Sequence, residues 1–243
     1  MLVAGSTSMR IEIWSDVVCP WCYVGKRRLE KALAGFEHAN DVEVVYRSFE
    51  LDPTAPRHGH ELSTGVIARK YGRSEDEMRD MQQQLIELAA RDGLAFRLFE
   101  TVHTNTVDAH RVLHLALETG GPVLQRDLKE ALLAAYFTHA RNVGDHDVLT
   151  EVAVAAGLDE ARVREVLAGT GYADAVAADV AQARAYGATG VPFFVVDGRY
   201  GVSGAQPAEV FSQLLDRAWS ESHPVLQTVG GDGEACGPDG CAI

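Results

Sequence analysis

Two segments near the start of the chain alternate apolar and polar residues, and this pattern predicts β-strands. In residues 10–16, "RIEIWSD", Ile11 and Ile13 lie on one face and the larger Trp14 closes it. Residues 41–51, "DVEVVYRSFEL", are rich in β-branched and aromatic residues, which favour strands. Between these segments, apolar residues recur at helical spacing among charged ones. The start of the chain is therefore predicted to form a strand, a helix and a second strand.

Strand character is absent between residues 61 and 186, and from residue 74 onward the apolar positions predict a series of helices. A capping box formed by Ser74 and Glu77 predicts the start of one helix. The apolar residues that follow, beginning with Met78 and Met81, recur every three or four positions and are expected in the core. Further helices are predicted at residues 105–118, 124–139, 147–156, 159–168 and 173–186.

Strand character returns near the end of the chain. Residues 193–196 and 199–202 are two short apolar segments around Asp197 and Gly198, a dipeptide that is typical of a type I′ hairpin turn. Residues 207–219 then predict a final helix. The order of elements is thus β-α-β, a long helical segment, and β-β-α.

This order predicts an α/β protein in which one domain is split by another. Residues 1–60 and 187–222 are expected to form the two halves of a sheet-containing domain, and residues 61–186 an all-helical domain inserted between them. Residues 223–243 are rich in glycine and carry two cysteines, and they are predicted to form a flexible tail.

Composition narrows the functional classes. The 243 residues carry a formal net charge of −13, with 47% apolar and 23% charged residues. Such an acidic chain lacks the basic surface that nucleic acids and anionic membranes require, so neither is an expected partner. No apolar run approaches the roughly 18 residues of a membrane span, and residues 1–14 lack the basic start of a signal peptide. The expected location is the cytoplasm, where paired cysteines are more often metal ligands or redox centres than structural disulfides.

Cys19 and Cys22, in "SDVVCPWCYVG", have two residues between them at the point where the first strand gives way to a helix. The free N–H groups and the dipole of a helix start stabilise a thiolate, and they lower a cysteine pKa from about 8.5 to roughly 3.5–7.5. We therefore expect Cys19 to be the exposed, low-pKa nucleophile and Cys22 to be the shielded thiol that resolves a mixed disulfide. Half of a zinc site is the alternative, but no Cys or His pair follows at zinc-finger spacing, so no metal is expected.

The CPWC motif at residues 19–22, together with Val191 and Pro192 before a later strand, resembles the thioredoxin fold. The helical insertion resembles DsbA-type oxidoreductases, and "NTVDAHR", "ALLAAYF", "TGVPFFVVDGRYGVSGAQ" and the cysteine-bearing tail are similar to their FrnE-like branch. The resemblance implies a thioredoxin-like α/β fold with a mixed central sheet and a large inserted helical domain. It implies thiol–disulfide oxidoreductase or isomerase activity on protein thiols or a small thiol, without a cofactor. It also implies a cis Val191–Pro192 bond facing the cysteines, with the Val191 backbone open to a substrate strand.

The same resemblance points to residues that would line a substrate cleft. Pro20 and Trp21 lie between the two cysteines. In the resembled family the start of the "NTVDAHR" helix faces the cysteine site, which makes Asn105, His110 and Arg111 candidates for substrate binding. Asn105 is equally suited to cap that helix.

Two further features leave alternatives open. Asp16, three residues before Cys19, relays a proton if it is buried beneath the thiols, or else it is an exposed turn residue. Cys236 and Cys241 flank a Gly-Pro-Asp-Gly turn, which brings their sulfurs close together. This second pair would either exchange electrons with Cys19 and Cys22 or form a self-contained disulfide.

Two rival functions share this architecture. Kappa-class glutathione transferases and 2-hydroxychromene-2-carboxylate isomerases hold a small thiol, but they usually carry serine in place of Cys19. A redox-regulated chaperone would bind its clients in the helical cleft and use the cysteines as a switch. The presence of both Cys19 and Cys22 favours redox exchange over the isomerase or transferase.

Overall fold

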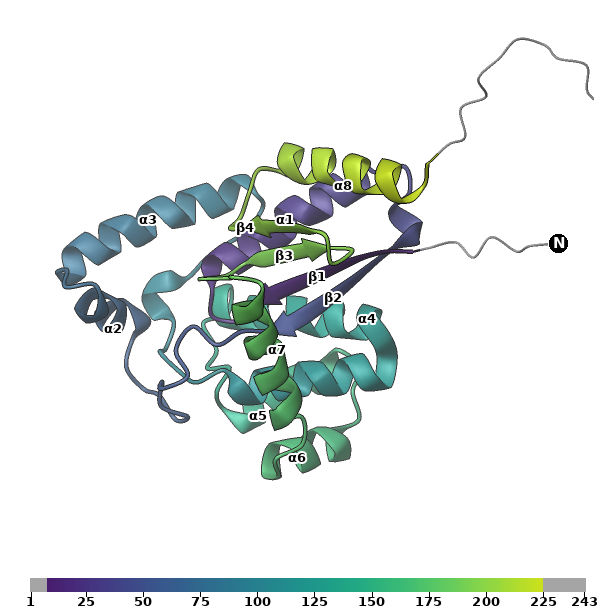
Figure 1. Cartoon of the computed structure of the whole chain (residues 1–243). Coiled ribbons are helices and arrows are strands. Elements are labelled where there is room, and N and C mark those ends of the chain that lie inside the picture. The colour runs from purple at the N-terminus through teal and green to yellow at the C-terminus, as the bar shows by residue number, and fades with distance from the viewer. Residues whose placement is uncertain (1–7, 225–243) are drawn as a thin grey trace, which may run out of the picture.

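The computed structural model describes residues 8–224, and within them the centre is a four-stranded sheet in the order β2-β1-β3-β4 (Figure 1). β1 (Met9–Ser15) runs parallel to β2 (Val42–Ser48) and antiparallel to β3 (Phe193–Val196). β4 (Tyr200–Ser203) runs antiparallel to β3. The mixed sheet implied by the family resemblance is confirmed. β2 ends at Ser48, three residues before the predicted end of that strand, and β4 begins one residue later than expected.

Helices surround the sheet. α1 (Pro20–Ala34) connects β1 to β2, and α8 (Ala208–Ser222) follows β4. The helices between β2 and β3 are α2 (Ser63–Lys70), α3 (Glu75–Arg91), α4 (Val107–Phe137), α5 (His146–Ala155), α6 (Glu160–Ala168) and α7 (Ala173–Ala185). Short 3₁₀ helices occur at Ala39–Asp41 and Leu98–Glu100.

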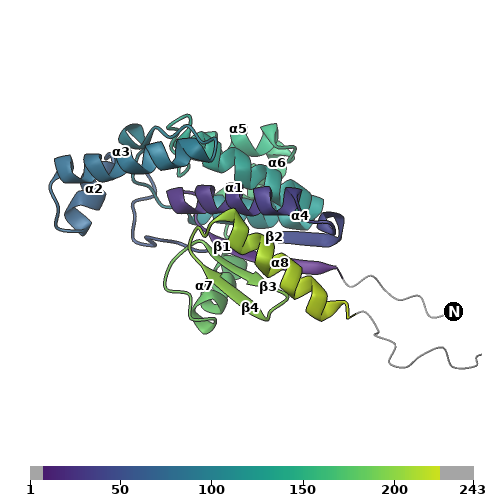
Figure 2. The ribbon, with the colours of Figure 1, turned by 90° about the horizontal axis from the view of Figure 1, so that it is seen from above.

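The two faces of the sheet are covered by different helices (Figures 1 and 2). α1 and α8 lie on one face, where Ile11 and Ile13 pack in the same cluster as Phe211. α7 lies on the opposite face, where the Trp14 indole Nε1 donates a hydrogen bond to the Asp179 carbonyl oxygen at 2.8 Å. The prediction that Trp14 closes the face of Ile11 and Ile13 is therefore wrong, because side chains alternate along a strand.

α4 runs along the free edge of β2. The Gln125 amide accepts a hydrogen bond from the Tyr46 N–H at 2.8 Å and donates one to the Tyr46 carbonyl oxygen at 2.9 Å, as a neighbouring strand would. The helix is kinked at Gly121, whose φ of 68° favours glycine, and Pro122 opens its second half. The kink marks the boundary between the two helices predicted in this region.

The predicted helix start at Ser74 and the predicted hairpin turn at Asp197 are confirmed, whereas one residue predicted in the core is exposed. Ser74 and Glu77 form the capping box of α3, and Asp197 and Gly198 have φ values of 50° and 66°, as a type I′ turn requires. Met81 is 48% exposed, although the sequence predicts it in the core. The reason is that α3 lies at the edge of the molecule and buries only one of its faces.

α2 and α3 extend beyond the end of the sheet at which β1 and β2 finish and α1 begins (Figure 1). The sequence pattern did not predict α2. The domain boundaries at residues 60 and 186 stay predictions, and α7, from within that range, packs on the sheet. Cys236 and Cys241 lie outside the described residues.

Candidate functional site

The two cysteines of the CPWC motif lie side by side where α1 begins. Cys19 immediately precedes the helix, and Cys22 lies in its first turn, with its N–H bonded to the Cys19 carbonyl oxygen at 3.0 Å. Both are free thiols, and they approach each other to 3.1 Å. Only 4% of Cys19 and 3% of Cys22 is exposed. The prediction of an exposed Cys19 is therefore wrong, because the loop at Val191 lies against it.

The loop before β3 approaches the cysteines through a cis Val191–Pro192 bond, as the sequence predicts. The Cys19 Sγ lies 3.5 Å from the Val191 carbonyl oxygen, within reach of a hydrogen bond from a thiol. Gly25 permits this approach, because a Cβ atom there would lie 3.0 Å from Pro192 Cγ and 3.2 Å from Phe194 Cζ. Any larger residue at position 25 would push α1 away from the loop.

The pKa values of the two thiols move in opposite directions. The hydrogen bond between them, burial and the negative charge of Cys22 raise the pKa of Cys19 well above its usual range. Burial also raises the pKa of Cys22, but the hydrogen bond from Cys19, the charge of Lys129 and the Ser15 hydroxyl outweigh it, so the pKa of Cys22 is lowered. For the reduced pair these directions favour a thiolate on Cys22, on the side of the positive charge, over the Cys19 thiolate expected from the helix start.

That positive charge comes from Lys129 of α4, which is fully buried. Its Nζ donates a hydrogen bond to the Ser15 carbonyl oxygen at 3.1 Å and lies 5.7 Å from the centre of the Tyr46 ring. Burial lowers the pKa of Lys129 to about 8, although the negative charges of Cys22 and Asp16 favour its protonated form. A cation thus reaches the thiol pair from a helix far away in the sequence.

Reasoning from the sequence missed Lys129, yet the pattern around it contains a signal. Leu128, Leu132 and Leu133 are fully buried and follow helical spacing, and Lys129 falls on the same stripe of α4. Lysine is almost never fully buried unless its charge is compensated. A lysine among the apolar positions of a helix therefore indicates a buried counter-charge.

Asp16 and His110 form a second buried pair next to the motif. His110 Nε2 lies 3.2 Å from Asp16 Oδ1, and the Leu51 N–H donates to Asp16 Oδ2 at 2.8 Å. Burial raises the pKa of Asp16, but the hydrogen bond and charge of His110 and the bond from Leu51 bring it below its usual value. Of the two alternatives for Asp16, the buried one is correct, and its negative charge contributes to the raised pKa of Cys19.

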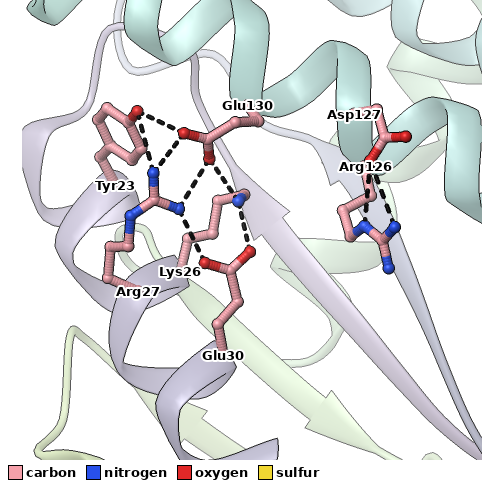
Figure 3. Close-up of polar contacts among 7 residues, drawn as sticks. All are labelled: Tyr23, Lys26, Arg27, Glu30, Arg126, Asp127 and Glu130. Atoms are coloured by element: carbon pink, nitrogen blue, oxygen red, sulfur yellow. Dashed lines mark hydrogen bonds and ion pairs between the residues drawn. The ribbon is translucent and has the colours of Figure 1, made fainter. Parts of the chain in front are cut away.

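Glu130, the neighbour of the buried lysine on α4, joins α4 to α1 (Figure 3). It accepts hydrogen bonds from the Tyr23 hydroxyl at 2.6 Å and from Lys26 and Arg27, which also pair with Glu30 at 2.5 and 2.8 Å. Burial raises the pKa of Glu130, but these three donors lower it to about 2. This network fixes α4 against α1 at Glu130, the residue next to Lys129, whose charge lies beneath the thiols.

A cavity of about 570 Å³ opens between the CPWC motif and helices α2 and α3. Cys19, Pro20, Trp21 and Val191 line it, as expected for residues that contact a substrate, whereas Cys22 does not. Trp21 is 42% exposed, which is unusual for so large an apolar side chain. A substrate that enters the cavity therefore meets Cys19 before Cys22.

Three residues predicted to line a cleft do not line this cavity. Asn105 Oδ1 accepts a hydrogen bond from the Val107 N–H at 3.0 Å, but the N-cap position of α4 is Thr106, so Asn105 is not the N-cap considered from the sequence. Arg111 is buried and donates to backbone carbonyl oxygens between the end of α6 and the start of α7, so its role is to hold those helices in place. His110 contacts Asp16 instead of the cavity.

Residues 8–224 contain no group of three or more His, Cys, Asp or Glu side chains placed to bind a metal ion. In the same range, every helix is too short or too polar to cross a membrane.

Known proteins similar to this chain were found by sequence and by structure. A family model described as "DSBA-like thioredoxin domain" matches residues 10–216. The crystal structure of a probable DsbA oxidoreductase from Streptomyces coelicolor is 51% identical, with a TM-score of 0.83 over 97% of this chain and 99% of its own. The uncharacterized protein YwbO of Bacillus subtilis (strain 168) is 27% identical over 214 residues, which are 86% of this chain and 96% of YwbO. The cytosolic disulfide reductase DsbM from Pseudomonas aeruginosa, solved with GSH, is 16% identical with a TM-score of 0.60 over 86% of this chain and 98% of DsbM, which shows a common fold.

Proposed function

This chain belongs to the DSBA-like thioredoxin domain family, and on that premise we propose that it is a thiol–disulfide oxidoreductase that works through Cys19 and Cys22. The observation that carries the proposal is the arrangement of the two thiols. They lie 3.1 Å apart, with Cys19 on the cavity and Cys22 behind it beside a buried cation. A pair so placed can accept a substrate at one sulfur and complete the exchange with the other.

The electrostatics support a specific order of steps. Cys19 passes its proton to the Cys22 thiolate as its sulfur attacks a substrate disulfide, and one substrate thiolate leaves. Cys22 then gives up that proton to the departing thiolate and attacks Cys19, which releases the second substrate thiolate. One disulfide forms in the protein as one breaks in the substrate, so two electrons pass from the protein to the substrate. The reverse sequence oxidises a substrate dithiol.

The buried charges lower the barrier to the second half of this exchange. Lys129 stabilises the Cys22 thiolate that must attack the mixed disulfide, because an opposite charge favours the ionised form. The hydrogen bond to Cys22 and burial, with a smaller contribution from Asp16, oppose ionisation of Cys19 in the reduced pair, which favours a proton on the sulfur that faces the cavity until a substrate arrives. In a substrate with several cysteines, a second substrate thiol that attacks the mixed disulfide would give disulfide isomerisation through the same intermediate.

We place this activity in the cytoplasm, with protein thiols and disulfides or a small thiol as partners. The cytosolic disulfide reductase DsbM provides a precedent for a cytosolic protein of this fold. Assignment to the FrnE-like branch rests on the sequence motifs alone.

The proposal is tested by trapping the mixed disulfide. The Cys22→Ser protein should accumulate a stable adduct between Cys19 and a substrate disulfide, seen as a mass increase of one substrate thiol. The Cys19→Ser protein should accumulate none, because Cys22 does not reach the cavity. A Ser220→Ala variant, altered at an exposed serine of α8 that does not line the cavity, serves as the control and should turn over without an adduct. Adducts on Cys22 instead of Cys19, or on neither, would refute the assigned roles.

A further inference from the structure

We propose that the cavity beside Cys19 binds small disulfides that have an apolar body and a negative charge. This inference deepens the proposed function and rests on it, because it names the class of substrate that meets Cys19. It is carried by the shape of the cavity, by its exposed apolar wall and by two cations at its mouth.

The wall of the cavity exposes apolar side chains that have no cover within the described residues. Trp21, Leu51, Tyr71 and Met81 all line it, and they are 42%, 41%, 67% and 48% exposed. Exposed apolar side chains scattered singly are normal, but a group of them around one cavity marks a binding site. Met81 adds an unbranched, adaptable side chain that suits ligands of varied shape.

The interior of the cavity is apolar as well, and its size fits a small molecule. Met78, Leu98 and Phe137 are buried and form part of its lining. A volume of about 570 Å³ falls within the range of about 300–1,000 Å³ typical of small-molecule sites. The site can therefore enclose an aromatic or branched aliphatic body while the sulfur attached to it lies at Cys19.

The lining favours a small molecule over an extended protein chain. A polypeptide that binds as an added strand needs the exposed backbone of a sheet edge. None of the lining residues belongs to a strand of the described sheet, and α4 already occupies the free edge of β2. Beyond the backbone at Val191, the cavity offers side chains of α2 and α3.

Two cations at the mouth select for negative charge. Lys70 and Arg73 line the cavity, are exposed, and form no ion pair within 4 Å among residues 8–224. Of the two carboxylates of the lining, Asp52 lies 3.3 Å from His103 and is also within the field of Lys70, and Asp16 pairs with its buried histidine partner. Arg73 acts in the same way on Glu77, at a distance too long for an ion pair. In a chain with a net charge of −13, such a pair of cations provides a local site for a carboxylate.

The test compares rates of exchange with three disulfides of different chemistry. The reduced protein is mixed with 5,5′-dithiobis(2-nitrobenzoate), which is aromatic and anionic, with 4,4′-dithiodipyridine, which is aromatic and uncharged, and with cystamine, which is aliphatic and cationic. For each disulfide, the second-order rate constant of a variant is divided by that of the unaltered protein. Intrinsic differences in reactivity among the three reagents then cancel.

Met81→Glu should slow the anionic disulfide about tenfold and the uncharged aromatic one by less, because a carboxylate then lies on the apolar wall. The double variant Lys70→Ala/Arg73→Ala should slow the anionic disulfide by about threefold to tenfold and leave the uncharged one within about twofold. Neither change should slow cystamine. The matched controls are Val123→Glu, at an apolar residue 58% exposed on α4, and Lys31→Ala, at an exposed lysine of α1.

Three outcomes separate the possibilities. Equal ratios for all three disulfides in the cavity variants would overturn the substrate class and leave the proposed exchange intact. If Met81→Glu slows exchange with a disulfide-bonded unfolded protein as strongly as exchange with the anionic reagent, the cavity serves polypeptides. That result would also overturn the proposed substrate class. Failure of the unaltered reduced protein to exchange with any disulfide would refute the proposed function itself.

Discussion

The two sides of the cysteine pair differ in the chemistry and the exposure of their side chains. On the inner side, Lys129 is charged, inaccessible to water and held by a hydrogen bond to the Ser15 carbonyl oxygen, and the equally buried Asp16 lies where the inner side meets the cavity. On the outer side, Trp21, Tyr71 and Met81 are apolar and exposed, the reverse of what burial would favour. Charges are thus buried and apolar groups exposed within one site, and each departure from the usual arrangement costs stability.

This contrast assigns a different task to each side. A buried charge acts strongly on the ionisation of a nearby thiol, because little water screens it. An exposed apolar wall does not change the charge of the thiols, but it holds whatever apolar group approaches them. The inner side therefore controls how readily the sulfurs ionise, and the outer side controls which molecules reach them. Variants of the two sides should separate these effects.

The largest expected effect concerns the cost of burying Lys129. Its pKa is about 8 in the folded protein against an ordinary 10.5, so between these values the unfolded chain binds more protons and stability rises with pH. Below pH 8 the buried charge costs about 3 kcal/mol, as expected for a pKa shift of this size. The free energy of unfolding of Lys129→Met should therefore exceed that of the unaltered protein most at pH 7. The difference between the two proteins should shrink towards pH 10.

Urea unfolding of the two reduced proteins at pH 7, 8.5 and 10 measures that difference. Lys31→Met, at an exposed position of α1, controls for the loss of a lysine as such. A stability difference that stays constant over this pH range would contradict the burial of a charged Lys129.

The next effect is on the ionisation of the thiols. Without the charge of Lys129, the pKa of the first thiol to ionise should rise by about 1–2 units, because an opposite charge no longer favours the thiolate. Thiolate absorbance at 240 nm against pH measures it. Lys31→Met, at an exposed position of α1, provides the control for the loss of a lysine as such. Lys129→Arg should recover part of the shift.

The same variant sharpens the contrast between the two sides. Lys129→Met should slow all disulfides by a common factor, whereas Met81→Glu should change their order and leave the thiol pKa unaltered. A thiol pKa shifted by Met81→Glu, or a changed order of disulfides in Lys129→Met, would mean that the two sides are not independent.

The smallest expected effect comes from Asp16. Its negative charge is the last of the main influences that raise the pKa of Cys19, so Asp16→Asn should lower that pKa by less than about 1 unit. The pH dependence of Cys19 alkylation in a Cys22→Ser background measures it. Because the asparagine side chain keeps an oxygen that can accept the Leu51 N–H, the fold should be retained. A raised pKa would argue that Asp16 acts by accepting a proton.

Features coded by short segments were predictable from the sequence. The strands of the sheet, the capping box at Ser74 and the hairpin turn at Asp197 each depend on a few adjacent residues, and each is found where it was predicted. α2 was missed because its eight residues, "STGVIARK", make only about two turns and combine a glycine with β-branched residues, which are weak helix formers.

Features that depend on how distant segments pack were not predictable in the same way. The expected low pKa of Cys19 follows from a helix start alone, whereas the lowering of the Cys22 pKa involves the charge of Lys129, which contacts Ser15 across 114 residues of sequence. Met81 carries the helical pattern of a core residue, but nothing in that pattern tells whether another element covers it. The burial of Cys19 likewise comes from Val191, 172 residues further on.

The clamp between Glu130 and α1 also determines when the site becomes reactive. During synthesis the two cysteines are made early, while Lys129 and Val191 follow more than a hundred residues later. Until α4 docks along β2 and Glu130 binds Lys26 and its neighbours, Cys22 lacks its counter-charge, and its pKa stays nearer the roughly 8.5 of a free thiol. We therefore expect the pKa of Cys22 to fall only once the fold is complete and Lys129 lies beneath it.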